Sequence, residues 1–288
     1  MTVRKPAPAE IRGVTFDLDD TLLRDDLSVS PFTVQVMRIL SARGVAVMPA
    51  SGRAFMSIKP FVDLLDCSAL YSTCNGAQIW DGATHQLLRE EAFPVALAHE
   101  IAAFGKEHGC YAQTYDNLRF YYNEHSVWEE RYAASSMMDG VFVGDLEQYI
   151  REPRSKILMM AEPEKIASML AEARTRFSGR ASVTCSKPYF LEFNPLTATK
   201  GIALEAEARM LGFAPENVMA FGDSLNDLSM LAAAGWSVAV ANGREEVRAQ
   251  CCAVCEDNNH DGVARYLAGF FGLSAEDFSS AAEVKIHD

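Results

Sequence analysis

The sequence has no apolar segment that approaches the roughly eighteen residues of a membrane-spanning helix, so we expect no such helix. Basic side chains are also scarce, because 26 Lys and Arg stand against 39 Asp and Glu and leave a formal net charge of −13. Nucleic-acid-binding proteins carry a basic face, and anionic membranes attract polybasic segments. The composition therefore argues against both kinds of partner. The first residues include no signal-type apolar region, which favours a cytoplasmic location.

Cysteines are few and irregularly spaced, and an odd number, seven in 288 residues, is not typical of a disulfide framework. Three of them form the cluster Cys251-Cys252-Ala253-Val254-Cys255, but no second pair follows at the spacing of a zinc site. We therefore expect these three cysteines to be small buried residues rather than metal ligands.

Two acidic clusters are the most informative feature that the sequence does contain. The first is Asp17-Leu18-Asp19-Asp20-Thr21-Leu22, and the second is Gly222-Asp223-Ser224-Leu225-Asn226-Asp227. Each directly follows a short apolar run of the kind that forms a buried parallel strand. Ligands of open α/β sheets bind beyond the carboxyl ends of the strands, so carboxylates from both clusters can meet there. Such a site suits Mg²⁺ and phosphate chemistry.

The spacing of apolar residues predicts strands and helices in alternation over residues 11–73, and again from Lys200 to Phe271. Between about residues 91 and 187 the rhythm differs. We therefore predict an α/β fold with a doubly wound, parallel-sheet, Rossmann-like core made of residues 1–83 and 190–288. Residues 84–189 are predicted to form an inserted α+β cap domain. Pro60 should kink or break its helix, and the polar tail from Ser274 should fray.

Asp17 comes first after a predicted strand, where its carboxylate would project into the cleft. A carboxylate there can act as a nucleophile and form an acyl phosphate. Asp19, two residues on, could protonate the leaving group and then serve as base for water. Alternatively, Asp17, Asp19 and Asp20 are only polar turn residues, which are common.

The second cluster supplies a carboxylate, Asp223, that is well placed to bind the metal. Asp227 could orient a metal-bound water or Lys200, or it could simply complement a helix dipole. Lys200 is poorly placed for that dipole, which suggests that it neutralises charge on the nucleophile and the phosphoryl group. Ser51 lies between a strand and a helix, where it suits a phosphoryl oxygen or an ordinary helix N-cap.

In chain order, four segments resemble the motifs of the haloacid dehalogenase-like hydrolases. They are the first acidic cluster, Ser51-Gly52-Arg53, Lys200-Gly201 and the second acidic cluster. The insert between the second and third motifs resembles the type IIB cap of the Cof-type phosphatases. The match spans nearly the whole chain. Asp20 stands where the family often has glycine, and Ser51 where it often has threonine, but neither departure removes a needed functional group.

The resemblance implies a Mg²⁺-dependent phosphatase that acts on a small phosphorylated metabolite through an aspartyl phosphate. Asp17 would attack phosphorus, Asp19 would be the acid and base, and Lys200 would assist. The ligands of Mg²⁺ would be the Asp17 carboxylate, the Asp19 carbonyl and Asp223. The phosphoryl group would be bound by Ser51, Gly52, Lys200 and Asn226, with Asp227 in support. Asn75 and Arg53 are candidates for substrate contact.

The substrate and the acceptor stay open at this point. A sugar phosphate is the first expectation, with pyridoxal phosphate and a nucleotide monophosphate as alternatives. A phosphotransferase or mutase would pass the phosphoryl group to a hydroxyl instead of water. A non-catalytic regulator would use the cleft only to sense a ligand, although such a module has no need of a nucleophile beside an acid. A monomer or small homo-oligomer is expected.

Overall fold

A computed structural model describes residues 5–283, and its centre is a five-stranded parallel sheet. The strand order is β14-β13-β12-β1-β2, and every neighbouring pair is parallel. The strands are β1 (Gly13–Phe16), β2 (Ala46–Pro49), β12 (Val218–Gly222), β13 (Trp236–Val240) and β14 (Ala253–Cys255). This parallel core confirms the predicted α/β class.

Helices cover both faces of the parallel sheet, as expected for a doubly wound fold. Alternate residues of β12 separate the two layers: Met219 and Phe221 pack with α1, α2 and α10, whereas Val218 and Ala220 pack with α7 and α8. The bounds of these helices and of the short α9 are α1 (Pro31–Ala42), α2 (Phe55–Leu65), α7 (Lys200–Met210), α8 (Leu228–Ala233), α9 (Glu245–Arg248) and α10 (Gly262–Phe271).

A three-stranded sheet adjoins the edge strand β2. Its strands β3 (Leu70–Thr73), β4 (Gln78–Asp81) and β5 (Leu87–Glu90) pair antiparallel to one another. Two parallel bridges, Val47 to Ser68 and Ala50 to Ser72, connect the segment around β3 to β2 and its C-terminal end. The turn Cys74–Gly76 therefore lies beside the carboxyl ends of the parallel strands.

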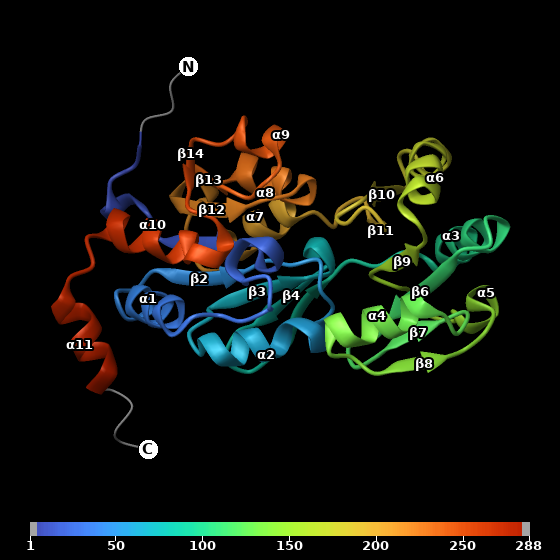
Figure 1. The fold of residues 1–288 in the computed structure, drawn as a ribbon, viewed down its shortest axis with the longest axis horizontal. Coiled ribbons are helices and arrows are strands. Elements are labelled where there is room, and N and C mark those ends of the chain that lie inside the picture. The colour runs from blue at the N-terminus through green and yellow to red at the C-terminus, as the bar shows by residue number, and fades with distance from the viewer. Residues whose placement is uncertain (1–4, 284–288) are drawn as a thin grey trace.

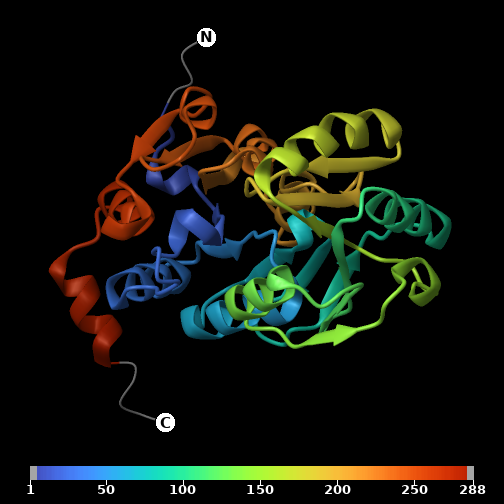
Figure 2. The same cartoon turned by 45° about the vertical axis from the view of Figure 1, so that its right-hand side comes forward.

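A six-stranded sheet forms the second part of the molecule, at the right of Figure 1. Its order is β10-β11-β9-β6-β7-β8. Its strands are β6 (Tyr111–Tyr115), β7 (Phe120–Tyr122), β8 (Gly140–Phe142), β9 (Ile157–Met160), β10 (Ala181–Thr184) and β11 (Phe190–Pro195). The helices of this part are α3 (Val95–Glu107), α4 (Val127–Ser136), α5 (Leu146–Tyr149) and α6 (Pro163–Arg176). We call residues 91–195 the inserted unit, and Figure 2 shows it as a separate lobe.

The inserted unit presents one face of its sheet toward the parallel core. Tyr111 and Leu158 on this face cluster with Tyr132 of α4 and with Ala54 and Cys74 of the core. The opposite face packs against α3 and α6. The sheet extends past residue 189, where the sequence placed a domain boundary, because the apolar run of β11 pairs with β9 and β10.

Three local expectations need correction. Of the three clustered cysteines, Cys255 is buried, but Cys251 is half-buried and Cys252 is exposed. The helix α2 continues unbroken through Pro60. The chain after Ser274 does not fray at once, because Ala275–Glu283 forms a helix, α11. Phe278 of α11 stacks on Phe32 of α1, and Asp277 pairs with Arg43, so the amphipathic segment is held against the core. Among the described residues, no helix is long and apolar enough to cross a bilayer.

Candidate active site

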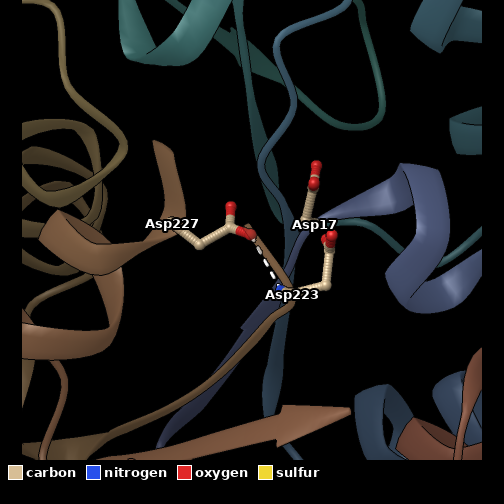
Figure 3. A group of neighbouring side chains, drawn as sticks. All are labelled: Asp17, Asp223 and Asp227. Carbon is tan, nitrogen blue, oxygen red and sulfur yellow. Dashed lines mark hydrogen bonds between the residues drawn. The ribbon is translucent and has the colours of Figure 1, made fainter. Parts of the chain in front are cut away.

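The register of the parallel sheet brings the two acidic clusters together. Phe16 of β1 lies opposite Phe221 of β12, and the chain turns after each strand. Asp17 follows β1 directly and Asp223 follows β12 directly, so their carboxylates project from neighbouring strand ends. Figure 3 shows both pointing into the same space, with Asp227 beside them. One oxygen of each of the three carboxylates lies within 4.8 Å of the others.

Lys200 lies at the centre of this cluster with its side chain fully buried. Its Nζ is 2.7 Å from Oδ1 of Asp17 and 2.6 Å from Oδ1 of Asp227. Burial alone would lower the pKa of Lys200, but the two carboxylates outweigh it and raise that pKa. The lysine is therefore a permanent cation between the two aspartates.

Asp227 uses both of its carboxylate oxygens within the protein. Oδ1 contacts Lys200, and Oδ2 accepts hydrogen bonds of 3.0 Å from the backbone N–H groups of Asp223 and Ser224. The dashed line in Figure 3 is the bond to Asp223. Asp227 is fully buried and folds the loop after β12. This arrangement favours a supporting role over direct metal binding.

Gly201 explains why lysine is followed by glycine in the third motif. A Cβ at this position would lie 2.4 Å from the backbone oxygen of Ser229. The glycine lets α7 approach α8, and its N–H donates to Oγ of Ser229 at 3.1 Å. Lys200, the first residue of α7, can then reach Asp227 at the start of α8.

The charge balance of the cluster suits a divalent cation. Burial and the neighbouring carboxylates raise the pKa of Asp17, against the opposing effect of Lys200. Burial and then Asp227 raise the pKa of Asp223 to about 7. Asp17, Asp19, Asp223 and Asp227 carry four negative charges when ionised. Lys200 and Arg53 offset two, so two negative charges remain. A hard cation with oxygen ligands fits this donor set and would relieve the repulsion.

Asp19 is held by Arg53 in a bidentate ion pair. Nε and Nη2 of Arg53 each lie 2.8 Å from a different oxygen of Asp19. Burial would raise the pKa of Asp19, but the guanidinium charge and its hydrogen bond lower it overall. Arg53 also donates to Oγ of Ser57 at 2.8 Å and to the backbone oxygen of Ser135 at 3.1 Å. The predicted substrate contact Arg53 thus orients Asp19 and reaches across to α4.

Ser51 lies behind the site and is fully buried. It is not the N-cap of α2, because that helix begins at Phe55 with Ala54 before it. Its Oγ instead accepts the N–H of Arg53 at 3.1 Å. Ser51 therefore shapes the turn whose next two residues, Gly52 and Arg53, line the cavity described below. The phosphoryl contacts of Ser51 and Gly52 stay predictions.

Asn226 and Asn75 belong to a chain of three amides that ends at Asn194 of β11. Nδ2 of Asn194 donates to the backbone oxygens of Cys74 and Ser155. Its Oδ1 must then accept from Asn75, and Oδ1 of Asn75 accepts from Nδ2 of Asn226, each at 3.1 Å. The two carbonyls fix this direction, because a carbonyl can only accept a hydrogen bond. Asn226 is left with an unpartnered Oδ1 at the cavity.

A cavity of about 110 Å³ lies between the acidic cluster and the inserted unit. Lys156 and Glu192 form a buried ion pair in its wall, with Nζ 2.5 Å from Oε1. Lys156 also donates to the backbone oxygen of Gly52 at 2.8 Å. Sequence reasoning missed these two residues. The available signal was one charged residue beside or within each of the apolar strands β9 and β11.

Comparisons with known proteins agree over most of the chain. A sequence model of the haloacid dehalogenase-like hydrolase family matches residues 14–267. A 5-amino-6-(5-phospho-D-ribitylamino)uracil phosphatase of Bacillus subtilis is 29% identical over 259 residues, covering 90% of this chain and 95% of that protein. An HMP-PP phosphatase of Serratia proteamaculans is 29% identical over 264 residues, covering 89% of this chain and 94% of that protein. The crystal structure of a haloacid dehalogenase-like hydrolase from Bacteroides thetaiotaomicron superposes with a TM-score of 0.82 at 26% identity. The superposition covers 91% of this chain and 100% of that chain.

Proposed function

The chain belongs to the haloacid dehalogenase-like hydrolases, and we propose that it is a Mg²⁺-dependent phosphatase of small phosphorylated metabolites, using Asp17 as nucleophile. The observation that carries the proposal is the contact of Lys200 with Asp17 and Asp227, beside Asp223 on the neighbouring strand end. A purely structural ion pair would not need a third, half-buried carboxylate whose pKa is raised to about 7. Phosphoryl transfer does need cations around the attacking carboxylate.

In this proposal, an oxygen of Asp17 attacks phosphorus and the leaving-group oxygen departs with a proton from Asp19. Water then attacks the aspartyl phosphate, and Asp19 takes the proton of that water. Arg53 contacts both oxygens of Asp19 and holds the ionised carboxylate toward the cavity for the second step, whereas in the first step the oxygen that carries the proton releases its contact with Arg53. Lys200 offsets charge on Asp17 and on the transferred group. Asp17 and Asp223 would hold Mg²⁺, which supplies electrostatic stabilisation of the phosphoryl oxygens.

The names of the relatives do not agree on one substrate. One is a phosphatase of a ribityl-bearing uracil phosphate and the other is an HMP-PP phosphatase. At 29% identity we carry over only the phosphatase class, together with the expectation of a small substrate. A cavity of about 110 Å³ supports a small leaving group. A sugar phosphate remains the first expectation.

The test is release of inorganic phosphate from a panel of phosphate esters, with p-nitrophenyl phosphate as a generic substrate. We expect release with added Mg²⁺, its loss with a chelator, and its recovery on Mg²⁺ readdition. Asp17→Asn should lower kcat by about a thousandfold or more, because the amide is not a nucleophile. Asp26→Asn, an exposed aspartate outside the site, is the matched control.

Two results would count against this proposal. Activity retained by Asp17→Asn would exclude Asp17 as the nucleophile. Transfer of labelled phosphate to an added sugar hydroxyl, in place of release to water, would identify a phosphotransferase instead.

A further inference from the structure

The wall of the cavity opposite Asp17 comes from the inserted unit, and its chemistry bears on the leaving group. Tyr132 and Ser136 of α4 and Phe190 and Glu192 of β11 line it, together with Lys156 just before β9. Glu192 and Lys156 are only 2% and 4% exposed. Charged side chains this buried need partners for all of their polar atoms.

Lys156 meets this requirement, but Glu192 does not. The ammonium group of Lys156 is held by Oε1 of Glu192 and by the backbone oxygen of Gly52. Oε2 of Glu192 is buried with no hydrogen-bond partner. An unpaired oxygen on a charged carboxylate is costly in a protein interior. Its position in the wall of a cavity indicates that a ligand supplies the missing donor.

Two other residues that line this cavity also have a buried oxygen without a hydrogen-bond partner. Oγ of Ser136 and Oδ1 of Asn226 are buried without a partner. The amide chain through Asn75 and Asn194 fixes Asn226 with its oxygen, not its nitrogen, unpaired. Three residues that line one cavity therefore each carry a buried oxygen without a partner, two from the inserted unit and one from the core. Each can accept a hydrogen bond.

Two of the three cations that line this cavity are already engaged. Arg53 is bound to Asp19, and Lys156 is bound to Glu192. Lys187 is the third cation that lines the cavity. The lining cation bound to Glu192, Lys156, is thus not free for a second anionic group on the leaving group, and the carboxylate of Glu192 would repel such a group.

We propose that Glu192, with Ser136 and Asn226, selects phosphate esters whose leaving group carries hydroxyl or amino donors and no second anionic group. A monophosphate of a sugar, a polyol or an aminated ring fits this description. The inference rests on the proposed phosphatase function and makes the leaving-group preference specific. Lys156 is the positioning residue that binds one oxygen of Glu192 and leaves the other without a partner.

The first experiment compares matched substrates with the wild-type enzyme and Mg²⁺. Fructose 6-phosphate is compared with fructose 1,6-bisphosphate, and ribose 5-phosphate with its 2-deoxy analogue, with p-nitrophenyl phosphate as reference. A site that hydrogen-bonds substrate donors rejects analogues that lack them. We expect kcat/KM to favour each hydroxyl-bearing monophosphate by about tenfold or more. Preference for the bisphosphate would overturn the inference.

The second experiment measures how selectivity changes in Glu192→Gln and Ser136→Ala. Lys156 should orient the new amide so that its oxygen faces the ammonium and its N–H₂ faces the cavity, where an acceptor stood before. The ratio of kcat/KM for the hydroxyl-bearing monophosphate to that for p-nitrophenyl phosphate should fall roughly ten- to a hundredfold, and less in Ser136→Ala. Equal losses on all substrates would mean a structural role and would overturn the inference.

The two proposals can fail separately. Hydrolysis of p-nitrophenyl phosphate with unchanged selectivity in folded Glu192→Gln and Ser136→Ala would leave the phosphatase and remove the inference. If the wild type hydrolysed no ester, the phosphatase proposal would fail. Calorimetric titration with the same esters would still decide the binding preference. If Glu192→Gln did not fold, Ser136→Ala and the wild-type panel would carry the test.

Discussion

Glu207 is a buried acid that the proposed chemistry does not use. It lies on α7, is fully buried, and neither of its carboxylate oxygens has a hydrogen-bond partner. Burial raises its pKa from 4.5 to about 8. In the folded protein it is therefore protonated near neutral pH, whereas in the unfolded chain it is ionised. Folding must take up a proton between these two pKa values, so Glu207 lowers stability progressively as the pH rises from about 4.5 to about 8.

Replacing Glu207 by methionine should remove this penalty, because the apolar side chain of similar length needs no partner. We expect Glu207→Met to raise the free energy of unfolding by a few kcal/mol at pH 8 and by much less at pH 5. Urea unfolding at both pH values measures this. Glu205→Met, an exposed glutamate on the same helix, is the control and should show no such pH-dependent gain. An equal gain for Glu207→Met at both pH values would refute the explanation.

The contact between α7 and α8 is the element-scale feature on which Lys200 depends. A Cβ at Gly201 would lie 2.4 Å from the backbone oxygen of Ser229, so a methyl group there must move the helices apart. We expect Gly201→Ala to destabilise the protein by about 1–3 kcal/mol, as overpacking does, and to lower kcat as well. The loss of kcat follows because Lys200 would withdraw from Asp17. Thermal unfolding and steady-state kinetics measure the two effects.

Gly269 offers a matched control, because it also lies in a helix, α10. Nothing lies within 4 Å of a Cβ at that position. Gly269→Ala should therefore stabilise the protein by about 0.5–1 kcal/mol, since alanine loses less backbone entropy than glycine. If both substitutions had the same sign, helix propensity and not helix spacing would explain them.

The proximity of the two acidic clusters could be predicted from the sequence, whereas the contacts around them could not. The reason is that both clusters follow strand ends. Asp17 and Asp223 each follow an apolar run directly, so the rule for open α/β sheets places them together without any tertiary information. Their metal and catalytic roles stay predictions. The contacts of Arg53 could not be read in this way, because they depend on Asp19 and on Ser135, which is 82 residues away.

The existence of the inserted unit could be predicted from the changed alternation of strands and helices, but the pairing register of its strands could not. Glu192 lies opposite Leu158 only through the antiparallel pairing of β11 with β9, which is separated from it by α6 and β10. No local pattern sets such pairings. The C-terminal segment was mispredicted for a related reason. Its polar sequence indicates fraying, but in the structure it forms α11, whose Phe278 stacks on Phe32 of α1.

At the scale of the whole molecule, Asn194 connects the inserted unit to the acidic core. Its single amide nitrogen donates to Cys74 of the core and to Ser155 of the inserted unit. In Asn194→Asp, a carboxylate oxygen would replace that donor and face both carbonyls. We expect a loss of stability of about 1–3 kcal/mol and a wider separation of the two parts. Small-angle scattering should then give a larger radius of gyration, and kcat/KM should fall because Asn75 and Asn226 lose their orientation.

Asn123→Asp separates this coupling from simple loss of a hydrogen bond. Asn123 also donates to a backbone oxygen, that of Cys110, but its two partners lie within the inserted unit. The control should therefore lose stability without changing the radius of gyration or the orientation of Asn226. Protonation of the new carboxyl in Asn194→Asp restores one donor, so acidification should partly return the compact form. If Asn123→Asp expanded the molecule as much as Asn194→Asp, the connection between the two parts would not run through Asn194.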